Sequence, residues 1–181
     1  MEMAVEDVRN LTPTTSDPST LGELLTAGKK VPPEPTSFLM QDHAEARALF
    51  AQYDSEDDDG KKSALAMRIC AVLTVHAQIE EEIFYPEAGK VLEDDEVITA
   101  AVEEHGEAKE RIARIVEGIS AGKSIGRDVK KLRRLVEHHV QEEESGMLPD
   151  VRQVDPDLHE IGAQLAARRL ELLRTLWREP T

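Results

Sequence analysis

Cysteine, aromatic residues and positive charge are all scarce in this chain of 181 residues. The single cysteine, Cys70, excludes an internal disulfide framework and a zinc site built from several thiolates. Lys and Arg number 22 against 37 Asp and Glu, and the formal net charge of −15 disfavours nucleic acid or an anionic membrane as a partner. Aromatic residues make up 3% of the chain, so we expect a core of Leu, Val, Ile, Ala and Met, typical of a helical bundle.

Long apolar runs are also missing. The longest one, from Ile69 to Val75, already contains Thr74, so no membrane-spanning helix is predicted. The first ten residues, MEMAVEDVRN, are acidic and contain no apolar run, which predicts no signal peptide. These features favour a cytoplasmic protein without a nucleic-acid or membrane partner.

Composition divides the chain into three parts. Residues 1–36 are rich in Pro, Thr and Ser and predict a flexible leader, in which Thr20 and Glu23 form a capping-box pair for one short helix. Residues 37–150 predict an up-down-up-down four-helix bundle, and residues 151–181 predict a C-terminal helix packed on it. The length fits one domain, and the expected fold class is all-α.

Apolar residues recur at helical spacing in five segments, which predicts helices over residues 36–53, 61–85, 94–120, 127–147 and 157–177. Pro86 and Gly89 are expected to end the second helix, and Pro149 is expected to stop the fourth. No segment alternates apolar and polar residues for long enough to predict a strand.

Four of the six histidines occupy the apolar faces of the four bundle helices, one on each: His43, His76, His105 and His139. A single histidine in such a position is usually a core residue with a hydrogen-bond partner. Four buried imidazoles without partners would cost on the order of several kcal/mol in desolvation. A shared cation removes that cost, so the four together predict a metal site.

The spacing of acidic residues repeats in the same way. Glu80 and Glu143 each follow a histidine at i+4, which places both side chains on one helical face. The segment DHAEAR, which starts at Asp42, resembles EHGEAK, which starts at Glu104, and equivalent histidines are 62 or 63 residues apart. The bundle is therefore predicted to be a duplicated helical hairpin, and each copy gives two histidines and one carboxylate to a common centre.

The fourth helix leaves its register open, because His138 and Glu142 are also related by i, i+4. The apolar positions Leu132 and Val136 favour His139 as the inward residue, so His138 is expected to be exposed or just outside the ligands. The other residues of the tracts Glu80–Glu82 and Glu142–Glu144 are expected to form a solvated face. Cys70 is expected to be a buried apolar residue and His159 a surface residue.

Imidazoles combined with carboxylates suit Fe, Mn or Zn, whereas Mg or Ca would favour oxygen ligands alone. Two carboxylates at one centre can each bridge two ions, which favours a dinuclear site. The Glu-x-x-His motif of ferritin-like di-iron bundles is absent, since the residues three positions before the four histidines are Met40, Leu73, Val102 and Val136.

These motifs together resemble the hemerythrin-like (HHE cation-binding) proteins of bacterial type: His43, His76-x3-Glu80, His105 and His139-x3-Glu143, followed by EEEIFYP and EEESGMLP. The resemblance covers roughly residues 37–150. It implies a non-haem centre of two Fe ions, with Mn or Zn as alternatives and with a bridging oxo or hydroxo group. Glu80 and Glu143 would bridge the ions, His43 and His76 would bind one of them, and His105 and His139 would bind the other.

Two departures separate the chain from the oxygen-carrying hemerythrins. Those proteins have a further histidine where this chain has Lys109, and a bridging aspartate five residues after the last histidine, where this chain has Glu143 at four. Reversible oxygen transport is therefore not expected. The leading hypothesis is a di-iron protein that binds or senses oxygen, peroxide or nitric oxide; the alternatives are a di-iron enzyme that consumes peroxide and a metal-free helical adaptor.

Overall fold

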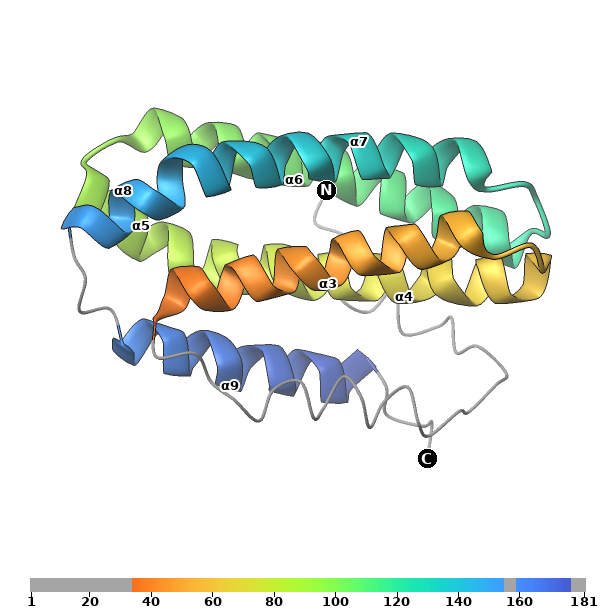
Figure 1. Cartoon of the computed structure of the whole chain (residues 1–181), viewed down its shortest axis with the longest axis horizontal. Helices are drawn as coiled ribbons and strands as arrows, with labels where there is room; N and C mark the ends of the chain where they lie inside the picture. Colours follow the sequence, from red (N-terminus) through yellow and green to blue (C-terminus); the bar gives the residue numbers. More distant parts are fainter. Residues whose placement is uncertain (1–33, 155–158, 177–181) are drawn as a thin grey trace.

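The computed structural model describes residues 34–154 and 159–176, and within them the chain is helical apart from short turns (Figure 1). In chain order the elements are α3 (Pro35–Ser55), α4 (Asp59–Ile79), η1 (Glu80–Phe84), α5 (Tyr85–Leu92), α6 (Asp95–Ser120), α7 (Gly126–Glu142), η2 (Glu143–Met147), α8 (Leu148–Val154) and α9 (His159–Leu176). No strand occurs in these two ranges, and the predicted all-α class is confirmed. The short helix predicted around Thr20 and Glu23 lies outside the described residues.

The four long helices form the predicted bundle. Helix α3 packs against α4 and α6 against α7, and α4 joins the two pairs through its contact with α6. Helix α9 lies on the outside of the first pair, along α3 and α4, as Figure 1 shows. The bundle with a C-terminal fifth helix is thus confirmed, and one pair of helices is covered by α9.

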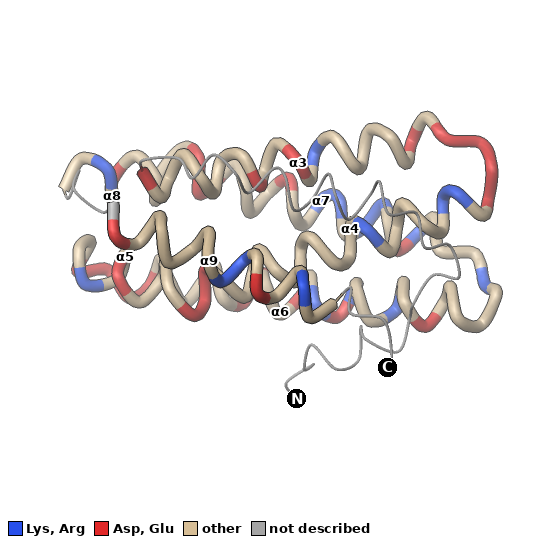
Figure 2. The backbone as a smooth tube through the Cα atoms, turned by 90° about the horizontal axis from the view of Figure 1, so that it is seen from below, with Lys and Arg blue, Asp and Glu red and all other residues tan. Residues whose placement is uncertain are grey.

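Acidic side chains begin three of the bundle helices. Glu34 accepts hydrogen bonds from the backbone N–H groups of Thr36 and Ser37 at 2.9 and 3.0 Å, which satisfies donors that a helix start leaves free. Asp58 caps α4 and Asp94 caps α6 in the same way. Asp58 belongs to the acidic run at the turn between α3 and α4, which is visible in Figure 2.

The predicted helix ends are wrong, because α5 runs through both Pro86 and Gly89 and α8 continues past Pro149. A π-helical turn precedes each proline: the backbone N–H of Tyr85 donates to the Glu80 carbonyl, and that of Leu148 donates to the Glu143 carbonyl. These bonds span five residues instead of four. The widened turn relieves the clash that a proline ring makes with the carbonyl four residues earlier, so the helix continues.

Branched aliphatic residues dominate the core, as predicted, and Cys70 is fully buried among them. Five aromatic side chains are buried as well: Phe38, Phe50, Tyr53, Phe84 and Tyr85. No described helix is both long enough and apolar enough to cross a bilayer.

Candidate metal centre

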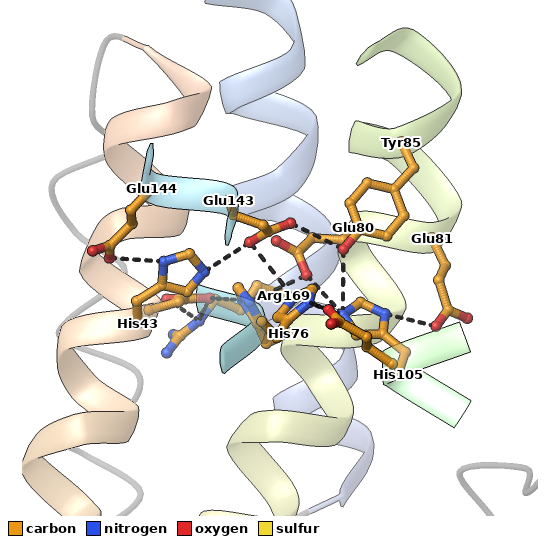
Figure 3. Close-up of polar contacts among 12 residues, drawn as sticks. His43, His76, Glu80, Glu81, Tyr85, His105, Glu143, Glu144 and Arg169 are labelled. Atoms are coloured by element: carbon orange, nitrogen blue, oxygen red, sulfur yellow. Dashed lines mark hydrogen bonds and ion pairs between the residues drawn. The ribbon is translucent and has the colours of Figure 1, made fainter. Parts of the chain in front are cut away.

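Six buried side chains converge between the four long helices, beside the two π turns. Figure 3 labels all of them except His139. Each bundle helix supplies one histidine, and each π turn begins with one glutamate. None of the six is more than 7% exposed. The structure therefore brings together all six residues singled out from the sequence: His43, His76, Glu80, His105, His139 and Glu143.

Glu80 lies between imidazoles of the two hairpins. Its Oε2 atom is 3.1 Å from His76 Nε2 on the preceding turn and 3.4 Å from His105 Nε2 on α6. Complete burial and the nearby charge of Glu143 raise the pKa of Glu80 well above 4.5. This carboxyl is thus held where a cation would stabilise its ionised form.

Glu143 repeats this arrangement from the second hairpin. Its Oε2 atom is 3.2 Å from His43 Nε2 on α3 and 3.6 Å from His139 Nε2 on its own helix. Burial alone would raise the pKa of Glu143, but the contact with His43 and the charge of His139 lower it to about 2. Each glutamate thus reaches one histidine of its own hairpin and one of the other, a geometry suited to bridging two ions.

A second ring of carboxylates surrounds the histidines and faces their outer nitrogens. Three of these carboxylates lie 2.9–3.0 Å from Nδ1 and the fourth lies 3.7 Å away: Glu144 for His43, Glu81 for His105, Glu104 for His139, and at the longer distance Asp42 for His76. An Nδ1–H that donates outward leaves the lone pair on Nε2, which points to the centre. At His43, His105 and His139 this contact therefore fixes the tautomer that a metal ligand requires, whereas at His76 the distance is too long for a hydrogen bond.

Two of these outer carboxylates are held by cations of the bundle helices themselves. Arg47 donates to both oxygens of Glu144 at 2.9 Å, and Lys109 donates to both oxygens of Glu81 at 2.6 and 2.7 Å. The expectation that Glu81 and Glu144 merely form a solvated face was wrong, since each orients a histidine. The signal was present in the sequence, because Arg47 and Lys109 end the repeated segments DHAEAR and EHGEAK.

Buried polar atoms that lack a hydrogen-bond partner show whether these side chains are suited to bind a metal ion. In the described part of the chain, these atoms of the cluster find no hydrogen-bond partner: His43 Nε2, both ring nitrogens of His76, both carboxylate oxygens of Glu80, and Glu143 Oε2. Buried lone pairs without donors cost free energy, and a cation is one partner that satisfies all of the inward-facing ones. The donor set therefore fits a metal centre.

The contact between His105 and His139 gives independent support for a metal ion at this centre. His105 Nε2 and His139 Nε2 lie 3.1 Å apart. Because both rings face carboxylates through Nδ1, the two Nε2 lone pairs point at each other, which is unfavourable unless a proton or a metal ion lies between them.

The histidines of the first pair differ in charge preference. Burial lowers the pKa of His76 well below 6.5, and the charge of His43 lowers it further. Burial also lowers the pKa of His43, but contact with Glu143 and the charge of Glu80 outweigh it, so the net shift is upward. His76 is therefore held neutral, the form that binds metal, while His43 retains a proton more readily.

Tyr85 is a site residue that the sequence analysis missed. It is 2% exposed, and its hydroxyl donates to Glu143 Oε1 at 3.0 Å and lies 3.3 Å from His105 Nε2. Burial, followed by the charges of Glu80 and Glu143, raises its pKa well above 10, which keeps the hydroxyl protonated as a donor. The sequence offered one indication of this role: Tyr85 directly precedes Pro86. In the structure it is the first residue after the π turn.

His138 lies outside the centre, as predicted, with its side chain 63% exposed. It faces Glu104 at 3.2 Å and Glu142 at 3.7 Å on the surface. The register of α7 therefore places His139, not His138, beside Glu143. The surface position expected for His159 concerns a side chain outside the described part of the structure.

A cavity of about 30 Å³ adjoins the four histidines and has room for one or two water-sized molecules. Its remaining walls include apolar side chains from three bundle helices: Val72, Leu73, Ile112, Val136 and Val140. A small uncharged molecule can therefore lie beside the histidines.

Comparison with known proteins matches residues 34–151 to the family model of the hemerythrin HHE cation binding domain. No curated protein and no solved structure shows a significant match. The matched region contains all six residues of the centre and ends before α9.

Proposed function

The chain belongs to the hemerythrin family of HHE cation-binding domains, and we propose that its six-residue centre holds two iron ions. The observation that carries the proposal is the set of buried nitrogen and oxygen atoms that lack hydrogen-bond partners among the described residues. Imidazole and carboxylate ligands suit iron, and they suit manganese and zinc as alternatives. In a metal-free adaptor, these buried atoms without partners would destabilise the fold, and no bound ion would offset the loss.

The distances support one assignment of ligands. The ligand atoms of His43, His76, Glu80 and Glu143 lie within 4.8 Å of one another, and so do those of Glu80, His105 and His139. Glu80 belongs to both groups, and Glu143 reaches histidines of both. We therefore assign one histidine pair to each ion and both glutamates to the bridge.

The ligand that best suits the site is a small molecule such as oxygen, nitric oxide or peroxide. When bound, iron supplies the redox chemistry and the open coordination positions. The protein supplies four imidazoles, two carboxylates and a small cavity whose walls include the apolar side chains of Val72, Leu73 and Ile112. Binding or sensing of a small ligand is the function that we propose.

An enzyme that consumes peroxide is the second candidate, and Tyr85 favours it. A hydroxyl 3.0 Å from Glu143 Oε1 places an O–H donor inside the centre, where it can hold a proton close to a reacting oxygen. Turnover of added peroxide by the iron-loaded protein separates this candidate from a binder.

Elemental analysis tests the proposal directly. The protein is purified without added metal and its metal content is measured, together with that of His105→Ala and of the matched control His138→Ala. We expect about two iron ions per chain in the native protein and in the control, and fewer in His105→Ala. Equal metal content in all three proteins, or none in the native chain, would contradict the proposal.

A further inference from the structure

Helix α9 lies beyond the region that the family model matches, yet it places a charged side chain next to the centre. Arg169, labelled in Figure 3, is 6% exposed and lines the same cavity as His43 and His76. Its Nε atom is 3.0 Å from Asp42 Oδ1, and a terminal nitrogen is 2.6 Å from Glu45 Oε2. The arginine thus ties α9 to two carboxylates of α3.

One of these carboxylates faces a histidine of the centre. Asp42 Oδ2 lies 3.7 Å from His76 Nδ1, on the outer side of the ring. The carboxylates that face His43 and His105 are held by cations of the bundle helices themselves, Arg47 and Lys109. The carboxylate that faces His76 is instead held by Arg169, which belongs to α9.

We infer that Arg169 is a positioning residue that sets His76 through Asp42, so that one metal position depends on the docking of α9. The inference rests on the proposed metal centre. At 3.7 Å the Asp42 carboxylate makes no hydrogen bond to His76, but its charge favours the tautomer that carries the proton on Nδ1 and leaves the lone pair on Nε2 for a metal. Without Arg169, Asp42 and Glu45 would be two neighbouring carboxylates that have lost their buried partner, and Asp42 would turn from His76 toward solvent.

The coupling acts in both directions. If docked α9 raises the affinity for one ion by some factor, then binding of that ion must favour docked α9 by the same factor. Metal loading is therefore expected to tighten a helix that contributes no direct ligand. This links the state of the centre to a surface element of the molecule.

The test compares Arg169→Gln with Arg168→Gln, its neighbour on α9. Arg168 is 30% exposed and pairs with Glu82 at 2.7 Å and Glu171 at 2.8 Å, so its loss weakens α9 at the surface without touching Asp42. Metal-free full-length chains are titrated with Co²⁺, and the visible absorption of the bound ion is followed. We expect two Co²⁺ in the native chain and in Arg168→Gln, but one of the two bound about 10- to 100-fold more weakly in Arg169→Gln.

A conservative variant and a second measurement keep the inference falsifiable. Arg169→Lys retains the charge and is expected to recover part of the Co²⁺ affinity. If Arg169→Gln fails to fold, hydrogen exchange of the native chain still decides: Co²⁺ should slow exchange in α9 as well as in the bundle helices. The inference would be overturned if the two glutamine variants bound Co²⁺ with equal affinity, or if Co²⁺ left the hydrogen-exchange rates of α9 unchanged. Either result would leave the proposed metal centre intact. A native chain that binds no Co²⁺ would instead overturn the proposed centre and the inference with it.

Discussion

The hydroxyl of Tyr85 donates to Glu143 Oε1 at 3.0 Å, and this contact breaks the symmetry of the duplicated centre. The equivalent position after the second π turn is Leu148, which is buried and carries no hydroxyl. Tyr85 also lies 3.3 Å from His105 Nε2, on the side of the second histidine pair. The two halves of the centre are therefore inequivalent even though each contributes two histidines and one glutamate.

Tyr85→Phe removes this hydroxyl and leaves the ring. A hydrogen bond to a charged group contributes about 1.5–3 kcal/mol, so we expect metal retention against a competing chelator to fall about tenfold or more. Tyr53→Phe is the matched control, because that buried tyrosine lies at the far end of α3, next to Lys62. Indistinguishable chelator competition curves for Tyr85→Phe and the native chain would show that the hydroxyl does not hold Glu143 in place.

Loss of either bridging glutamate should remove both ions. Glu80 and Glu143 each contact histidines of both pairs, so Glu80→Ala or Glu143→Ala weakens both positions at once, whereas His43→Ala is expected to lose one ion. Glu142→Ala is the control, since its side chain is 60% exposed. Metal content per chain is the measurement; two ions retained in Glu143→Ala but lost in Glu142→Ala would reverse the assigned register.

The sequence was sufficient for the helices and the six central residues because both follow from periodicity. A histidine or glutamate on an apolar helical face points into the core, and the apolar positions Leu132 and Val136 placed His139 rather than His138 inside. Pro86 and Pro149 were misjudged because helix-stop rules assume bonds over four residues, and the π turns use five. The contact of Arg169 with Asp42 could not be predicted from the sequence, because the two residues are 127 positions apart and meet only through the docking of α9.

Metal removal is expected to lower the melting temperature of the chain. An ion that binds only the native state stabilises it by RT ln(1 + [L]/Kd), about 2.7 kcal/mol at a hundredfold excess over Kd. The centre joins all four bundle helices, so the whole bundle shares this gain. Thermal melts with and without chelator check the prediction, and an unchanged melting temperature would contradict a centre that links the helices.

Acid should release the metal, beginning at His43. Ligating imidazoles must be neutral, and the pKa of His43 is raised above 6.5 by Glu143 and Glu80 although burial opposes the shift. Protons therefore compete at His43 at a higher pH than at a free histidine, whereas His76, with its lowered pKa, stays neutral. We expect metal affinity to fall steadily as the pH drops through about 6, measured by equilibrium dialysis. An affinity that rises on acidification would be inconsistent with histidine ligation.

Glu34 should stabilise α3 in a pH-dependent way. Burial raises its pKa, but hydrogen bonds from Ser37, Thr36 and Arg152 lower it to about 2. Because this value lies below the usual 4.5, the stabilisation is fully present above pH 4.5 and is lost as the pH falls toward 2. Glu34→Ala is expected to cost about 1 kcal/mol at pH 7, the usual value of a helix cap.

Urea unfolding of the metal-free chain at pH 7 and at pH 3 measures this effect. The difference between Glu34→Ala and the native chain should shrink at the lower pH. Glu107→Ala, an exposed position in the middle of α6, controls for the loss of a surface carboxylate. A difference that grows on acidification would contradict the role of the ionised cap.

The last prediction concerns oxygen, and it depends on Lys109. Its Nζ atom donates to both oxygens of Glu81 at 2.6 and 2.7 Å, so it supports the carboxylate that faces His105. An ammonium group has no lone pair and cannot serve as a further ligand. In the proposed centre, two histidines and one oxygen from each glutamate would hold each ion, so neither ion would have a full set of protein ligands. A centre open on both ions is expected to be oxidised when the reduced protein meets oxygen, without reversible storage.

The protein is reduced anaerobically, exposed to oxygen and then degassed while its visible spectrum is followed. An absorption band that disappears on degassing and returns on each new exposure would contradict this expectation and indicate a reversible carrier.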